Sequence, residues 1–125
     1  MDFIILGILL GLIAILLIKR FVTPKYLKVL DQEEFKSGYR KAQLIDVREP
    51  REFEGGHILG ARNIPMSQIR QRMNEVRTDQ PVYLYCHSGA RSKQAASYLK
   101  KKRGCTDLSH LKGGFKKWEG KIKKK

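Results

Sequence analysis

The sequence has few cysteines, few acidic residues and no internal repeat. Its two cysteines in 125 residues exclude a disulfide-rich secreted scaffold and a four-cysteine zinc site. Twelve Asp and Glu stand against 26 Lys and Arg, which gives a formal net charge of +14 and excludes an acidic binding protein. The chain is 42% hydrophobic, which is sufficient for one packed domain and too apolar for a disordered chain.

A long apolar run opens the chain. Residues 3–18 are apolar without interruption, and Lys19 and Arg20 follow them. As a helix, residues 3–22 would extend roughly 30 Å, the thickness of the hydrocarbon layer, and no signal-peptide cleavage pattern follows them. The sequence therefore predicts a transmembrane anchor with its juxtamembrane segment over residues 1–23. A buried core helix, the alternative, would be shorter or amphipathic.

Basic residues next to this run predict its orientation. Lys19, Arg20, Lys25 and Lys28 all follow the apolar run and no basic residue precedes it. Because the cytoplasmic flanks of membrane helices carry the positive excess, residues 24–125 are expected to be cytoplasmic in a single-pass membrane protein. Free thiols persist in that compartment, so a reactive cysteine is allowed there.

The rest of the chain alternates between strand and helix patterns. Asp31 and Glu34 have the spacing of a helix-capping box. Apolar patterns predict strands over 26–29, 43–47, 62–64, 81–86 and 106–111, and helices from Asp31, over 67–76, over 90–102 and around Phe115, Trp118 and Ile122. This alternation predicts an α/β fold with a five-stranded parallel sheet between helices.

The loop after the most apolar strand carries the candidate chemistry. Cys86 ends that strand and a helix begins at Ala90, and ligands of open parallel sheets bind where strands end and helices begin. At this position Cys86 is expected to be exposed, with loop amides and the helix N-terminus favouring its thiolate. Gly89 lets the loop curl. The alternative is an inert, buried cysteine at a strand end.

Three motifs in order along the chain resemble those of the rhodanese family. The loop itself has the pattern Cys-x-x-Gly-x-Arg, and the other two motifs flank it. The matching positions are residues 46–49, 52–53, 56–58, 60–61 and 63–65, then Cys86, Gly89, Arg91 and Ser92, then residues 111–115 and Trp118. The resemblance covers residues 26–120 and implies a rhodanese-like domain over 24–120, followed by a lysine-rich tail over 121–125.

The resemblance implies sulfur transfer. The Cys86 thiolate would take a sulfane sulfur from thiosulfate or from a persulfide-carrying protein, hold it as a persulfide and pass it to a thiol or another nucleophilic acceptor. No cofactor and no metal is expected. The residues implied for this chemistry are Cys86 as the nucleophile, His87, Ser88, Gly89, Ala90 and Arg91 as the active loop, and Asp46 and Ser92 as supporting residues.

Two alternatives stay open. Some domains of this fold are noncatalytic binding or scaffold modules, although the intact loop argues against that function. The fold also hosts dual-specificity phosphatases and arsenate reductases, whose loops hold one more residue between Cys and Arg. The four residues between Cys86 and Arg91 should form a ring that suits one sulfur better than a phosphate.

Other polar residues near these motifs have structural interpretations. Asp46 is expected to pair with Arg91 or to hold the loop, or else to cap a helix or a turn. Arg48, Glu49 and Glu52 are expected to form local ion pairs that are worth little energetically.

The two histidines outside the loop and the second cysteine are not expected to take part in chemistry. His57 and His110 lack companions at metal-ligand spacing. Cys105 begins a strand whereas Cys86 ends one, so the two thiols should lie at opposite ends of the sheet. We therefore predict that Cys105 is a small apolar filler.

The positive charge is concentrated near the C-terminus. Residues 91–125 carry 13 basic and two acidic residues, whereas residues 29–90 carry nine of each. In the rhodanese arrangement, a terminal helix would bring the tail toward the anchor, where anionic lipid could bind it. Nucleic acid is the weaker alternative because stacking aromatics are lacking nearby. The lysines in question are Lys121, Lys123, Lys124 and Lys125.

Overall fold

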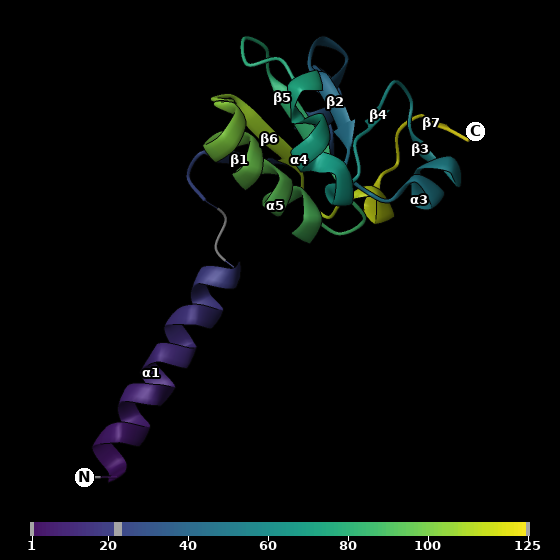
Figure 1. The fold of residues 1–125 in the computed structure, drawn as a ribbon. Coiled ribbons are helices and arrows are strands. Elements are labelled where there is room, and N and C mark those ends of the chain that lie inside the picture. The colour runs from purple at the N-terminus through teal and green to yellow at the C-terminus, as the bar shows by residue number, and fades with distance from the viewer. Residues whose placement is uncertain (1, 22–23, 125) are drawn as a thin grey trace.

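The structure is a computed structural model that describes residues 2–21, with side chains up to residue 18, and residues 24–124 (Figure 1). The α-helices are α1 (Asp2–Phe21), α2 (Gln32–Gly38), α3 (Pro50–Glu54), α4 (Ile69–Arg72) and α5 (Ala90–Tyr98). The strands are β1 (Leu27–Leu30), β2 (Gln43–Asp46), β3 (His57–Ile58), β4 (Arg62–Asn63), β5 (Val82–Tyr85), β6 (Leu108–Leu111) and β7 (Ile122–Lys123).

Five of the strands form one parallel sheet in the order β1-β6-β5-β2-β4, which confirms the predicted fold class. The central strand is β5, in which Leu84 lies opposite Ile45 of β2 and His110 of β6. Successive side chains of β5 enter different layers. Leu84 packs in the cluster that contains the buried face of α5, whereas Tyr85 packs with Phe35 of α2. Helices α4 and α5 lie side by side over one face (Figure 1).

Helix α2 begins as its sequence predicts. The Asp31 carboxylate accepts a hydrogen bond from the Glu34 amide at 2.8 Å, and the Glu34 carboxylate accepts one from the Asp31 amide at 3.2 Å. This capping box satisfies amides that have no partner within the helix. It directs Phe35 into the core, where the side chain is fully buried.

The N-terminal helix is present, but the transmembrane span predicted over residues 3–22 is not supported. Among the described residues, no helix has both the length and the apolar run that crossing a membrane requires. The uninterrupted run of residues 3–18 corresponds to about 24 Å of helix, shorter than the roughly 30 Å hydrocarbon core. Val22, at the end of the predicted span, lies outside the described residues.

The predicted terminal helix is wrong. Phe115 lies in a three-residue 3₁₀ turn (Phe115–Lys117), Trp118 has an extended backbone, and Ile122 belongs to β7. Phe115 and Trp118 pack against the core, whereas Ile122 is 48% exposed, so the three residues form no helical apolar stripe. Strand β7 pairs antiparallel with β3 instead.

The path of the tail also differs from the prediction. The Ile58 amide in β3 donates a hydrogen bond to the hydroxyl of Tyr85, the last residue of β5. Strand β7, which carries Lys123 opposite His57, therefore lies near the end of the sheet at which Cys86 follows. The tail therefore does not run toward the start of β1, contrary to the prediction from the sequence. Lipid binding by the tail lysines stays an untested prediction. Lys125 lies outside the described residues.

Two predicted helices are shorter or broken. The predicted helix over 67–76 is split into α4 and two flanking 3₁₀ turns. Helix α5 continues from Tyr98 into one π turn (Leu99–Arg103), which keeps Leu99 buried and ends at Gly104. The Arg103 guanidinium donates a hydrogen bond to the Val76 carbonyl at 2.9 Å, joining the ends of these two segments.

Candidate active site

The loop from Cys86 to Arg91 connects the carboxyl end of β5 to the N-terminus of α5. Cys86 is only 1% exposed, so the expectation that it is exposed at the sheet edge is wrong. Its side chain belongs to the buried core cluster that also contains Leu84. The exposed residues of the loop are His87, Ser88 and Ala90. An incoming ligand would therefore meet these exposed residues before it reaches the sulfur.

The loop backbone curls around the sulfur. The Gly89 amide donates a hydrogen bond to Cys86 Sγ at 2.9 Å, and Ser92 Oγ lies 3.7 Å from the same sulfur. Gly89 has φ of +117°, a left-handed conformation that residues with a Cβ rarely adopt. It also directly precedes α5, whose N-terminal amides favour negative charge. These features place a hydrogen-bond donor and the positive end of a helix beside Cys86 Sγ.

A second glycine supports the loop from the C-terminal motif. Gly114 has φ of +67°, and a Cβ at this position would collide with the His87 carbonyl and lie 2.7 Å from the Cys86 carbonyl oxygen. The Phe115 amide donates to the Cys86 carbonyl at 2.8 Å, and the Lys116 amide donates to the His87 carbonyl at 3.2 Å. Residues 111–115 were part of the recognised motif, but this backbone contact was not predicted.

Arg91 is fixed by a partner that the sequence did not identify. Its guanidinium forms a bidentate ion pair with the Glu52 carboxylate of α3, at 2.6 Å and 3.0 Å. The Arg91 guanidinium lowers the pKa of Glu52 to about 2. The local ion pair predicted for Glu52 is therefore wrong, because the pair joins residues 39 positions apart.

Asp46 does not pair with Arg91. It binds the buried Arg48, with Nη2 2.7 Å from Asp46 Oδ2, and it accepts the Arg48 amide at 2.9 Å. The Arg48 guanidinium also donates to the Gly56 carbonyl at 2.6 Å and lies 4.3 Å from the centre of the Phe115 ring. Arg48 thus joins β2 to the segment that supports the active loop. The pair is local, as predicted, but it is buried rather than a weak surface pair.

Ser92 and His110 form a buried contact beneath the loop. Ser92 Oγ donates a hydrogen bond to the Gly89 carbonyl at 2.9 Å and lies 2.8 Å from His110 Nδ1. His110 is 3% exposed, and burial lowers the pKa of its imidazole to about 4, so the ring is neutral. The sequence marked Ser92 as a supporting residue. It gave no sign of His110, because residues 92 and 110 meet only in the folded domain.

Comparison with known proteins now identifies the family. The model of the rhodanese-like domain matches residues 31–121. The chain belongs to the rhodanese-like domain family. The match covers every strand of the parallel sheet except β1, the active loop and Gly114, and it agrees with the resemblance seen in the sequence.

Relatives and solved structures agree with this assignment. The protein YqhL of Bacillus subtilis is 68% identical over 101 residues, which cover 81% of this chain and 79% of that protein. The thiosulfate sulfurtransferase GlpE of Pseudoalteromonas translucida is 32% identical over 107 residues, 86% of this chain and 94% of that protein. A rhodanese-like domain protein from Staphylococcus aureus superposes with a TM-score of 0.69 at 29% identity, covering 78% of this chain and 98% of that one. These names support a sulfurtransferase-type function in general.

The remaining candidate residues of the rhodanese-like domain have structural roles. His57 stacks on Phe53 with ring centres 3.6 Å apart, and its Nδ1 lies 2.8 Å from the Phe53 carbonyl. Cys105 is a free thiol in the buried core, which confirms that it is an apolar filler, and burial raises its pKa. Over residues 2–21 and 24–124, no group of three or more His, Cys, Asp or Glu side chains is arranged to hold a metal.

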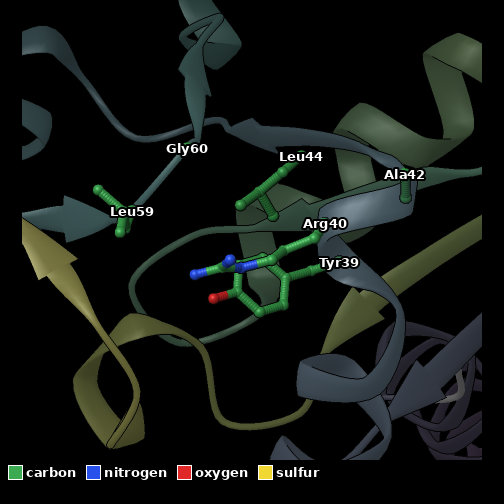
Figure 2. A pocket seen from close by; sticks show the side chains of 6 residues that line it. All are labelled: Tyr39, Arg40, Ala42, Leu44, Leu59 and Gly60. Carbon is green, nitrogen blue, oxygen red and sulfur yellow. The ribbon is translucent and has the colours of Figure 1, made fainter.

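A separate pocket of about 400 Å³ lies away from the active loop. Figure 2 shows its six lining residues, with the side chains of Tyr39 and Arg40 both directed toward Leu59. Ala42, also in the lining, precedes β2 and thus lies at the amino end of the sheet, whereas Cys86 follows the carboxyl end of β5. The pocket shares no lining residue with the loop.

Proposed function

We propose that this rhodanese-like domain is a sulfurtransferase that works through a persulfide on Cys86. The observation that carries this proposal is the 2.9 Å hydrogen bond from the Gly89 amide to Cys86 Sγ, in a short loop at the start of α5. An amide that already points at the sulfur stabilises its anionic form without rearrangement. A thiolate and a persulfide are both anions, so the same donor serves both states.

The first half of the reaction loads the sulfur. The Cys86 proton leaves to solvent, and the thiolate attacks the outer sulfur of thiosulfate. A new S–S bond forms on Cys86 while the S–S bond of the donor breaks, and sulfite departs with the electron pair. A thiolate and a thiosulfate dianion thus become a persulfide anion and a sulfite dianion, so that charge and atoms balance.

The second half returns the enzyme to its resting state. An acceptor thiolate, or cyanide in an assay, attacks the outer sulfur of the persulfide, and Cys86 departs as a thiolate. No cofactor enters either step. Arg91 contributes by holding the loop through its ion pair with Glu52. His87, Ser88 and Ala90 form the exposed rim that a donor meets first.

The relatives support sulfur transfer over the two alternatives. Besides GlpE, a sulfurtransferase of Allochromatium vinosum is 43% identical over 75 residues, 60% of this chain and 69% of that protein. The loop retains its cysteine, its glycine and the paired arginine, all of which a noncatalytic module could lose. Four residues between Cys86 and Arg91 leave a smaller ring than phosphatases of this fold use.

The test is sulfur loading and transfer by the full chain. After thiosulfate treatment, mass spectrometry should find one added sulfur atom on Cys86, and Cys86→Ser should abolish thiosulfate-to-cyanide transfer. The matched control is Cys105→Ala, which removes the other thiol and should keep the activity. Phosphate-ester hydrolysis without a persulfide would instead indicate a phosphatase. A protein that neither gains sulfur nor turns over substrate would be a binding module.

We also propose that α1 attaches the domain to a lipid membrane. The large apolar side chains between Phe3 and Ile18 are 50% to 87% exposed, so the described chain does not cover them. An all-apolar helix surface of this size is costly in water. The full chain should float with lipid vesicles, and a Leu9→Asp/Ile13→Asp variant should not, whereas Leu59→Asp in the folded domain should leave flotation intact. A full chain that stays with the soluble fraction would contradict this proposal.

A further inference from the structure

His110 is a buried side chain that the sulfur-transfer mechanism has not used. Its Nδ1 lies 2.8 Å from Ser92 Oγ, and its Cε1 lies 3.8 Å from the position of a Cβ on Gly89, directly beneath the active loop. Its Nε2 is buried without a hydrogen-bond partner among the described residues. A buried polar atom without a partner is costly, so its protonation state is constrained.

The hydrogen bonds select one tautomer. If Nε2 carried the proton, a buried N–H donor would have no acceptor, and Ser92 would have to give its hydrogen to Nδ1 instead of the Gly89 carbonyl. If Nδ1 carries the proton, it donates to Ser92 Oγ, and Ser92 remains free to donate elsewhere. The second arrangement leaves only an unpaired acceptor, which proteins tolerate better than an unpaired donor.

We propose that His110 is a positioning residue for Cys86: its Nδ1–H donates to Ser92 Oγ and so reserves the Ser92 hydroxyl hydrogen for the sulfur. In the thiol state, this hydrogen binds the Gly89 carbonyl, as the 2.9 Å distance indicates. When Cys86 ionises, the hydroxyl rotates toward Sγ, 3.7 Å away, and joins the Gly89 amide as a second donor to the thiolate. His110 acts only through Ser92 and exchanges no proton with substrate.

The role of this contact rests on the proposed function, because a more stable thiolate matters only if Cys86 reacts. Ser92 is 0% exposed, so water does not replace the hydroxyl if it is removed. A hydrogen bond to a charged group in such surroundings is worth roughly a tenfold change in an equilibrium. The His110–Ser92 contact should therefore change how much of Cys86 is thiolate at a fixed pH.

The experiment measures the ultraviolet absorbance of the thiolate at neutral pH, in full-length protein with Cys105→Ala so that only Cys86 contributes. Ser92→Ala and His110→Phe should each lower the thiolate fraction several-fold, and the double variant should be no worse than Ser92→Ala alone. His110→Asn, whose amide places an N–H where Nδ1–H was, should restore it. His57→Phe, the matched change at the other buried histidine, should have no effect.

Several results would overturn the proposal. These results are an unchanged thiolate fraction in His110→Phe, an equal loss in His110→Phe with and without Ser92, and a failure of His110→Asn to restore the fraction. A nitrogen NMR spectrum of the unaltered protein covers the case in which variants do not fold: it should show protonated Nδ1 and bare Nε2, and the opposite tautomer refutes the proposal. Neither readout needs sulfur transfer, so a failure of the proposed function appears separately in the turnover assay.

Discussion

Glu52 holds Arg91 in a two-point ion pair, with Oε1 2.6 Å from Nη1 and Oε2 3.0 Å from Nη2. This pair connects α3 to the end of the active loop and fixes the direction of the guanidinium. Charge-assisted, bidentate pairs of this kind give geometric specificity as well as energy. The loop is therefore held from a segment that lies far away in sequence.

We expect Glu52→Gln to slow sulfur transfer roughly tenfold, because one lost charge-assisted hydrogen bond is worth about 1 to 2 kcal/mol. The expected loss is in kcat/KM for thiosulfate, with unfolding by urea measured alongside. Glu54→Gln is the matched control, since Glu54 is exposed in the same helix. Equal rates for the two variants would show that the ion pair does not order the loop.

Gly114→Ala should both destabilise the domain and impair the loop. Its Cβ would meet the His87 carbonyl, and its backbone has positive φ. Gly104→Ala measures the cost of the positive φ alone, because Gly104 has φ of +86° and nothing lies within 4 Å of its Cβ position. We expect Gly104→Ala to cost about 1 to 2 kcal/mol of unfolding free energy and to leave turnover intact. Gly114→Ala should cost more and lose turnover, measured by urea unfolding and thiosulfate assay.

Protonation of His110 should make stability depend on pH. Burial lowers its pKa from the ordinary 6.5 to about 4, so the unfolded chain takes up a proton in this range before the folded domain does. The unfolding free energy should therefore fall as pH decreases from 6.5 to about 4, by at most roughly 3 kcal/mol. His110→Phe should lose this part of the pH dependence in urea titrations. An unchanged slope in the variant would assign the effect to other groups.

Positive charge near the loop should steer anionic donors. The Lys116 amide binds the His87 carbonyl, whereas Lys101 lies in the π turn at the far end of α5. We expect Lys116→Glu to lower kcat/KM for thiosulfate roughly threefold at low salt, and less as salt screens the charge. Lys101→Glu changes the net charge equally and should have little effect. If both variants behave alike, the net charge matters rather than its location.

The local features of the site followed from sequence, and its long-range contacts did not. The strand, the loop and the start of α5 were predicted because Cys86, Gly89 and the flanking apolar residues lie within one short segment. Glu52 and His110 were missed because each meets the loop only through the sheet topology, 39 and 18 positions from its partner. No local spacing encodes such a pair.

The error at the C-terminus has a different cause. Phe115, Trp118 and Ile122 have helical spacing. A 3₁₀ turn followed by a strand satisfies the same spacing when two of the residues are partly buried and the third is exposed. Strand β7 instead pairs with β3 in a separate two-stranded sheet, and the sequence pattern did not predict this pairing. Apolar spacing alone could not separate these outcomes.

The burial of Cys86 also bears on its chemical lifetime. Oxidation of a thiol to sulfenic and then sulfinic acid requires thiolate character and access for the oxidant. At 1% exposure, the surrounding loop restricts the access of an oxidant to the sulfur. Bulky oxidants and disulfides should therefore be kept from Cys86, which would preserve the thiol that the proposed sulfur transfer requires.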